Sequence, residues 1–211
     1  MSLDFHTAKM LAALPYRQSF YHTGGWKNAP PPADGSRFQV FLNQHFTRLE
    51  LDAAASFAAQ LEDMQKRRDR SILPPGRPRR IGHVSWWDAD YPLPLRTIFD
   101  PPPVLFYALY GDRFPNQNSV YEAIVGTRRP HRVCQQAVQA WVGQLSEQSA
   151  PKGELWIVSG FAKGVDRLAH EAALDRGLGS IAVLGSGLGK AGPRSNLDLL
   201  GLAAQKDAPL L

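Results

Sequence analysis

The chain has 211 residues, a formal net charge of +5 and a sequence pI near 9.5. Hydrophobic residues make up 44% of it and charged residues 20%, which is typical of a globular protein and excludes an intrinsically disordered one. No apolar run approaches the ~18 residues of a membrane-spanning helix and no signal-peptide core is present, so we expect a cytoplasmic protein. The single cysteine, Cys134, fits a reducing compartment. The positive charge favours a polyanionic partner, either nucleic acid or an anionic surface.

The first 65 residues predict a small helical region. Its best helix covers residues 47–65, where an apolar residue recurs every four positions on one face, at Leu49, Ala53, Phe57 and Leu61. Residues 66–80, KRRDRSILPPGRPRR, indicate a basic linker rich in proline and glycine. This linker is either a solvated connector or an arm that tracks phosphates. A third region with a different pattern covers residues 81–211.

From residue 81 onward, short apolar runs alternate with amphipathic segments. The runs predict strands at 81–87, 104–109, 121–125, 155–159 and 180–184, and the amphipathic segments predict helices at 131–148, 165–176 and about 194–205. In the first of these helices the apolar stripe expected to face a core consists of Val133, Cys134, Ala137, Val138, Trp141, Val142 and Leu145. The alternation predicts a Rossmann-like α/β fold, with a parallel sheet and helices on both of its faces.

Three of the predicted strands end in glycine turns. The candidate phosphate-binding residues are Gly126, Thr127, Arg128 and Arg129 in the first turn, Ser159, Gly160, Phe161, Lys163 and Gly164 in the second, and Gly185, Ser186, Gly187 and Lys190 in the third. In a parallel sheet such turns share the carboxyl edge of the strands, where these folds bind ligands. Glycine lets backbone N–H groups approach a phosphate, and two turns lead into helix N-termini, which favour anions. Arg132, Arg167 and Arg194 add positive charge, so the edge is wider than a mononucleotide needs.

Signatures of other sites are missing. The dinucleotide fingerprint GxGxxG does not follow the first strand, neither GxxxxGK[ST] nor GxSxG occurs, and histidines and carboxylates are too scattered for a metal site. We therefore expect no cofactor and no metal. Asp166 and His170 lie four residues apart on one helical face, as an acid/base pair or as a structural brace; the lack of a nearby nucleophile favours the brace. Phe161 either stacks on a nucleobase or packs back onto the sheet.

Five segments, taken in order, resemble the DprA/Smf family of DNA-processing proteins. These segments are Asp90-Tyr91-Pro92 with Leu95, Ile98 and residues 100–105; residues 124–128; residues 158–166 with His170, Ala173 and Leu174; residues 181–188; and Pro193-x-x-Asn196-x-x-Leu199. Together they cover roughly residues 84–211. Five ordered motifs make this resemblance far more specific than a single glycine loop.

The resemblance implies an extended Rossmann-like domain that binds single-stranded DNA rather than a redox cofactor, with no established enzymatic activity. It implies that Arg128 contacts DNA and that basic positions near Lys163 contribute. Asn196, from the last motif, joins the candidate DNA-binding residues. The resemblance also implies the loading of a RecA-type recombinase onto single strands, in transformation or in general recombination, and usually a homodimer.

The sequence also departs from the family. The family domain normally continues past the end of this chain, so we expect a truncated domain whose residues 208–211 begin an apolar strand. Gly192 stands where the family usually has Tyr, and the N-terminal region lacks a clear helix-hairpin-helix glycine signature. Three interpretations stay open: a non-enzymatic mediator that binds single-stranded DNA, a small-nucleotide-binding module or nucleotide hydrolase of the phosphoribohydrolase-type superfamily, and an interaction module whose fold depends on a partner.

Overall fold

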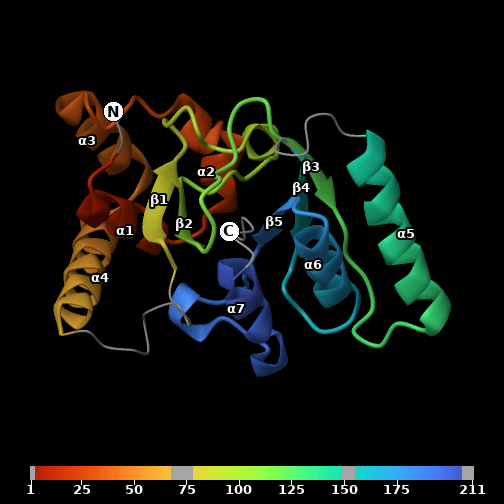
Figure 1. Cartoon of the computed structure of the whole chain (residues 1–211). Helices are drawn as coiled ribbons and strands as arrows, with labels where there is room; N and C mark the ends of the chain where they lie inside the picture. Colours follow the sequence, from red (N-terminus) through yellow and green to blue (C-terminus); the bar gives the residue numbers. More distant parts are fainter. Residues whose placement is uncertain (1–2, 68–77, 149–154, 206–211) are drawn as a thin grey trace. The chain divides into compact units, whose positions relative to one another are not determined.

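The computed structural model describes residues 3–67, 78–148 and 155–205 (Figure 1). Most of the predicted basic linker and the predicted terminal strand lie outside these residues. Within them, no helix is long and apolar enough to cross a membrane.

The chain forms two compact units, the first of residues 1–69 with 83–106 and the second of residues 70–82 with 107–211. This division differs from the boundary at residue 81 that the sequence suggested. The reason is that Trp86, Trp87 and Val104 belong to the hydrophobic core of the N-terminal helices. Apolar side chains that follow the linker in sequence therefore complete the first unit.

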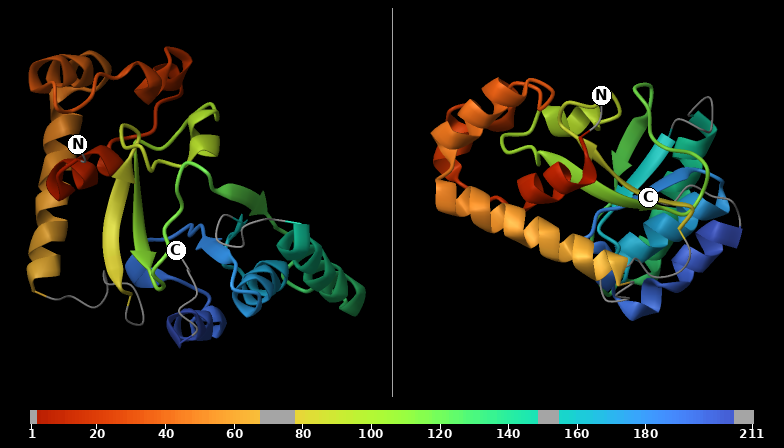
Figure 2. Two further views of the ribbon diagram at one scale, coloured as in Figure 1. Left: turned by 45° about the horizontal axis from the view of Figure 1, so that its top comes forward. Right: turned by 90° about the vertical axis from the view of Figure 1, so that its left-hand side faces the viewer.

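Among the residues that the structure describes, the first unit contains four α-helices. They are α1 (Phe5–Ala13), α2 (Gln18–His22), α3 (Gly35–His45) and α4 (Arg48–Lys66), with 3-10 turns at Gly25–Asn28 and Leu93–Arg96. Helix α4 begins with a capping box, in which Thr47 and Glu50 satisfy each other's backbone N–H groups. α1 packs along α4 (Figure 2). The core is rich in aromatic rings, such as Phe20 and Trp26, whose centroids lie 5.0 Å apart.

Helix α4 forms where it was predicted, but its buried face is a different one. Leu51, Ala54 and Ala58 are buried, whereas Leu49 is 79% and Phe57 is 49% exposed. Two apolar stripes run along this helix, and the sequence pattern favoured the one with larger side chains. The small alanines let α1 approach α4 closely, so the packing selects the other stripe.

Two short strands, β1 (Arg80–Ser85) and β2 (Val104–Leu109), pair in a two-stranded sheet. The segment between them is held by polar contacts around Asp88, whose carboxylate accepts bonds from the Ser85 N–H at 2.8 Å and hydroxyl at 2.7 Å. The guanidinium of Arg96 lies over the rings of Trp86 and Tyr91, at 4.9 and 5.2 Å. Tyr91 is buried and donates to the Pro102 carbonyl. Two residues of the first family-like motif, Tyr91 and Pro102, thus contact each other within this segment.

The second unit contains a parallel sheet of β3 (Val120–Ala123), β4 (Leu155–Ser159) and β5 (Gly179–Ala182), in that order. Its helices are α5 (Arg132–Gln148), α6 (Val165–Asp175) and α7 (Asp198–Gln205). α5 and α6 lie side by side, and their apolar residues share a core with β4 (Figures 1 and 2). The predicted Rossmann-like fold, preceded by a helical region, is confirmed. The predicted helix at 194–205 is split, because a 3-10 turn, Arg194–Asn196, precedes α7.

Only part of the apolar stripe predicted on α5 is buried. Val138 and Val142 face the core, whereas Val133 is 76% and Trp141 is 48% exposed. The stripe is wider than the line of contact with α6 and the sheet, so its outer half stays at the surface. The indole N–H of Trp141 donates to the Glu122 carboxylate at 3.1 Å. Cys134 is partly buried against the core, as expected for a small hydrophobic side chain.

Candidate nucleic-acid interface

The three glycine turns leave the sheet at one edge. Because β3, β4 and β5 are parallel neighbours, their carboxyl ends lie side by side. Two further backbone bonds extend the pairing into the turns, from the Ile124 N–H to the Val158 carbonyl at 2.9 Å and from the Val183 N–H to the Ser159 carbonyl at 2.8 Å. We call the set formed by residues 126–129, 160–164 and 185–190 the turn edge.

The first and second turns pack directly on each other. Gly164 has a φ of +82°, and a Cβ there would lie 2.3 Å from the Thr127 carbonyl oxygen. The Val165 N–H, at the start of α6, donates to that same oxygen at 3.1 Å. A Cβ on Gly126 would lie 2.9 Å from a methyl of Val165. These two glycines let one turn approach the other. The sequence had instead suggested that the glycines allow close approach of the backbone to a phosphate.

Asp166 closes the second turn from inside. Its carboxylate accepts a bond from the Ala162 N–H at 3.2 Å. A Cβ on Gly160 would lie 2.9 Å from the same carboxylate, so this glycine leaves room for it. Ser159 is buried, and its hydroxyl donates to the Ile124 carbonyl at 2.6 Å. Asp166 and Ser159 thus hold the turn in shape, which agrees with the brace interpretation of Asp166.

His170 is fully buried and pairs with a residue that the sequence did not single out. Its Nδ1 lies 2.7 Å from the hydroxyl of Ser180, on β5. The sequence had suggested Asp166 as its partner instead. Burial lowers the pKa of His170 to about 4, although the charge of Asp166 acts in the opposite direction. The imidazole is therefore neutral near pH 7 and out of reach of a substrate, so it fits a structural role better than acid/base chemistry.

Two candidate DNA-binding side chains point into the protein. The ring of Phe161 is 1% exposed and packs with Leu174 and Leu199, 5.6 Å from the ring of His170. In this conformation it cannot stack on a base, so packing onto the sheet is the interpretation that fits. Asn196 is completely buried, and its amide donates to the carbonyls of Phe161 and Ala162. Both side chains shape the second turn and offer no surface to a phosphate.

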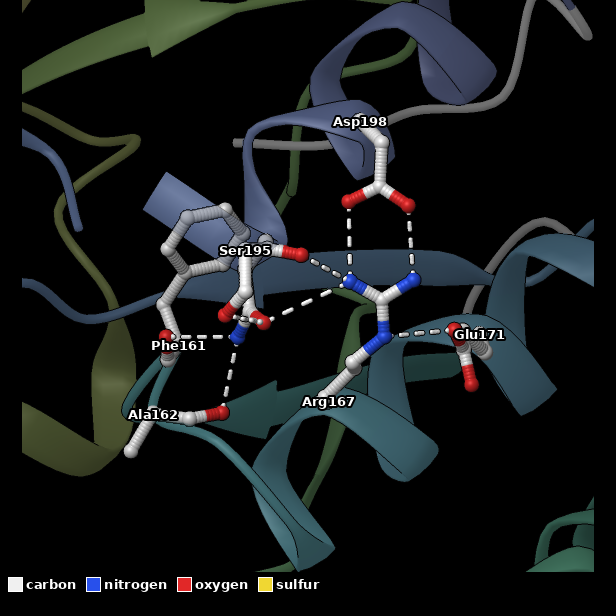
Figure 3. A network of polar contacts seen from close by, with 7 residues as sticks. Phe161, Ala162, Arg167, Glu171, Ser195 and Asp198 are labelled. Atoms are coloured by element: carbon white, nitrogen blue, oxygen red, sulfur yellow. Dashed lines mark hydrogen bonds and ion pairs between the residues drawn. The ribbon is translucent and has the colours of Figure 1, made fainter. Parts of the chain in front are cut away.

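Arg167 was counted as a cation of the edge, but its charge is compensated by neighbouring carboxylates. Its guanidinium pairs with two carboxylates, those of Glu171 and Asp198 (Figure 3). Asp198 was not identified from the sequence; a carboxylate two residues after Asn196 carries no recognisable signal. Glu171, four residues after Arg167 on one helix, is the partner that spacing alone suggests.

The remaining candidate side chains lie at the surface. The exposed residues of the turn edge and its flanks are Gly126, Thr127, Arg128, Arg129 and Arg132 at the first turn, Gly160 and Lys163 at the second, and Gly185, Ser186, Gly187, Lys190 and Arg194 at the third. The Thr127 hydroxyl accepts a bond from the Arg129 N–H, and the Ser186 hydroxyl donates to the Lys190 carbonyl. A row of exposed cations on adjacent turns suits a phosphate backbone. Among the described residues, no group of three or more His, Cys, Asp or Glu is arranged to hold a metal.

Sequence comparison assigns the chain to a known family. A sequence model of the family described as DNA recombination-mediator protein A matches residues 82–210. The chain belongs to this family. The resemblance to DprA/Smf is thereby confirmed, and the matched residues include all three turns of the edge.

Curated relatives carry the same family names. DNA processing protein DprA of Bacillus subtilis is 33% identical over 156 residues, which are 74% of this chain and 50% of that protein. DprA of Streptococcus pneumoniae is 39% identical over 120 residues, which are 56% of this chain and 39% of that protein. The chain thus spans half or less of the length of these relatives.

A solved structure shows the same fold. The X-ray structure of DNA processing protein A (DprA) from Streptococcus pneumoniae is similar to this chain with a TM-score of 0.57 and 24% sequence identity. The match covers 97% of this chain and 65% of that one. It supports the Rossmann-like assignment, because a similarity at this identity describes the fold.

Proposed function

We propose that this chain binds single-stranded DNA along the turn edge and acts as a non-enzymatic mediator of DNA recombination in the cytoplasm. One observation carries the proposal: Arg128, Arg129, Lys163 and Lys190 are exposed on three adjacent turns, of which the first two pack directly on each other. Family membership supports a role in recombination. The resemblance to DprA/Smf supports a single strand as the ligand.

The spread of exposed cations over three turns suits a ligand that carries several phosphates, as a DNA strand does. Neighbouring strands of a sheet lie about 5 Å apart, so the outer turns of a three-stranded edge lie about 10 Å apart. A DNA strand that crosses the edge meets the cations of each turn in succession. Since Phe161 is buried, phosphate contacts rather than base stacking supply the affinity. Binding is then tolerant of sequence and steeply dependent on salt.

The proposal extends to two partners. A RecA-type recombinase would be loaded onto the bound strand, during DNA uptake or recombination, and a second copy of the protein would form a homodimer. Both proposals follow from the DprA/Smf resemblance. They concern whole DprA/Smf proteins, and this chain spans half or less of the length of the two relatives described above. Transformation and general recombination both fit this role.

The test is fluorescence anisotropy with labelled oligo-dT and with a duplex of equal length, at several salt concentrations. We expect tighter binding of the single strand and a steep fall of affinity with salt. Arg128→Ala should weaken binding to all sequences and reduce the salt slope by about 0.7, the share of one phosphate contact on a single strand.

The matched control is Arg48→Ala, which removes the same charge from the 96% exposed side chain on α4 in the other compact unit. Equal affinity losses in the two variants would contradict a site on the turn edge. A thermal shift with mononucleotides but no oligo-dT binding would instead favour the small-nucleotide interpretation.

A further inference from the structure

Arg167 lies in the first turn of α6, just after the second glycine turn, and its side chain, which is 28% exposed, contacts carboxylates of two segments (Figure 3). Its Nε bonds to the Glu171 carboxylate at 2.8 Å, within the same helix. Its two terminal nitrogens bond to the two carboxylate oxygens of Asp198, at 2.8 and 2.6 Å. This bidentate fork joins α6 to the first residue of α7.

The same guanidinium also holds the 3-10 turn that precedes α7. Its Nη1 donates to the Ser195 carbonyl and lies 3.4 Å from the side-chain oxygen of Asn196. The hydrogen bond from Arg167 lowers the pKa of Asp198, so the carboxylate stays charged and the fork stays closed over the ordinary pH range. Arg167 thus fixes residues 194–198 through three different groups.

Asn196 transmits this constraint to the turn edge. With its oxygen turned to Arg167, its amide nitrogen donates to the carbonyls of Phe161 and Ala162, at 3.0 and 2.8 Å. Those carbonyls belong to the second turn, which carries the exposed Lys163. A continuous series of bonds therefore runs from Asp198 through Arg167 and Asn196 to the backbone next to Lys163.

We infer that Arg167 is a positioning residue for the DNA-binding edge, acting with Asp198 to hold the second turn and the start of α7 in one arrangement. This inference rests on the proposed function. It assigns Arg167 no phosphate contact, because two carboxylates already occupy its guanidinium. Binding geometry, rather than charge, is what Arg167 contributes to the edge.

The inference makes a prediction opposite in sign to simple electrostatics. Asp198→Ala removes a negative charge beside a surface that binds a polyanion, and electrostatics alone predicts tighter binding. The positioning role predicts weaker binding, by about three- to tenfold, since the fork is lost and the second turn is released. Glu171→Ala is the matched control: it removes a carboxylate from the same guanidinium but leaves the bonds between segments intact. Its affinity should stay within about twofold of the original chain or rise.

A second variant keeps the net charge constant. Arg167→Lys retains the positive charge but cannot form the two-pronged bond to Asp198, so its affinity for oligo-dT should fall about as much as that of Asp198→Ala. The double variant should then bind no worse than either single variant, because both remove the same link. Circular dichroism and thermal melting confirm that each variant is folded before its affinity is compared.

Hydrogen exchange provides a readout that needs no DNA. In Asp198→Ala and Arg167→Lys, backbone amides of residues 160–164 and 194–198 should exchange faster than in Glu171→Ala. If the original chain binds no single-stranded DNA while exchange rises as expected, the proposed function fails and the link stands. Tighter oligo-dT binding by Asp198→Ala, or unchanged exchange in the second turn, would overturn the inference.

Discussion

The first and second turns of the edge look alike in sequence but differ in what they expose. Both follow a parallel strand, contain glycine and carry basic residues. The first turn exposes Arg128 and Arg129, whereas the second buries Phe161 and Asp166 and exposes Lys163. The first turn therefore presents charge, and the second mainly supports the arrangement. A glycine-rich turn after a strand indicates where a site lies, while burial decides which of its side chains face a ligand.

The contact between the two turns is where the largest effect is expected. Gly164→Ala places a methyl group 2.3 Å from the Thr127 carbonyl at a φ of +82°, so the free energy of unfolding should fall by about 3 kcal/mol or more. Urea denaturation measures this change. Gly185→Ala in the third turn is the control, because a Cβ there has nothing within 4 Å; its effect should stay within about 0.5 kcal/mol. Similar losses of stability in Gly164→Ala and Gly185→Ala would contradict a special role for the close contact between the first and second turns.

Acid should weaken the support under the second turn. The pKa of His170 is about 4 in the folded protein and 6.5 in the unfolded chain. Between these values the unfolded state binds the proton more tightly, so stability is full above pH 6.5 and declines as the pH falls towards 4. The total loss is about 3 kcal/mol. Urea titrations from pH 7 to 4 should reveal it, and His170→Gln should flatten that part of the profile. An unchanged slope in the variant would assign the acid sensitivity to other groups.

A conservative substitution of Phe161 distinguishes a role in folding stability from a direct role in DNA binding. Phe161→Leu keeps an apolar side chain among Leu174 and Leu199 but fills less space, which should cost about 1 kcal/mol of folding stability. Oligo-dT affinity should stay within about twofold, since the ring does not reach the surface. Thermal melting and anisotropy on the same preparation test both. A large affinity loss without destabilisation would instead mean that the ring turns outward to a base.

The smallest effect on stability is expected at an exposed side chain, where DNA binding rather than folding should change. Lys163→Ala should leave the free energy of unfolding within about 0.5 kcal/mol, because the side chain is exposed. It should weaken oligo-dT binding by about two- to fivefold at low salt and lower the salt slope by about 0.7. Lys27→Ala, an exposed lysine of the first unit, serves as the control. Equal effects of the two lysines would indicate diffuse attraction rather than a contact on the second turn.

Local patterns predicted the bounds of several elements well. The strands at 104–109 and 155–159 have the predicted bounds, because each is an apolar run enclosed by turn-forming or polar residues. The start of α4 at its Thr47 cap also follows from residues adjacent in sequence. The faces of α4 and α5 were predicted less well. Each helix carries more apolar positions than its neighbour can cover, and sequence alone does not say where the neighbour lies.

The sequence by itself determined the fold class, the order of the strands and helices, the family and the presence of three basic glycine turns. These depend on short-range patterns and on motifs whose spacing is visible in one chain. Only the tertiary structure decided that Gly164 serves contact between turns, that His170 pairs with Ser180, and that Arg167 is compensated by Asp198. Those partners lie on different elements, and a side chain's role depends on what surrounds it after the elements pack. Burial and pairing are long-range properties, so the sequence alone could not separate the exposed cations of the turn edge from Arg167, whose charge is paired with Glu171 and Asp198.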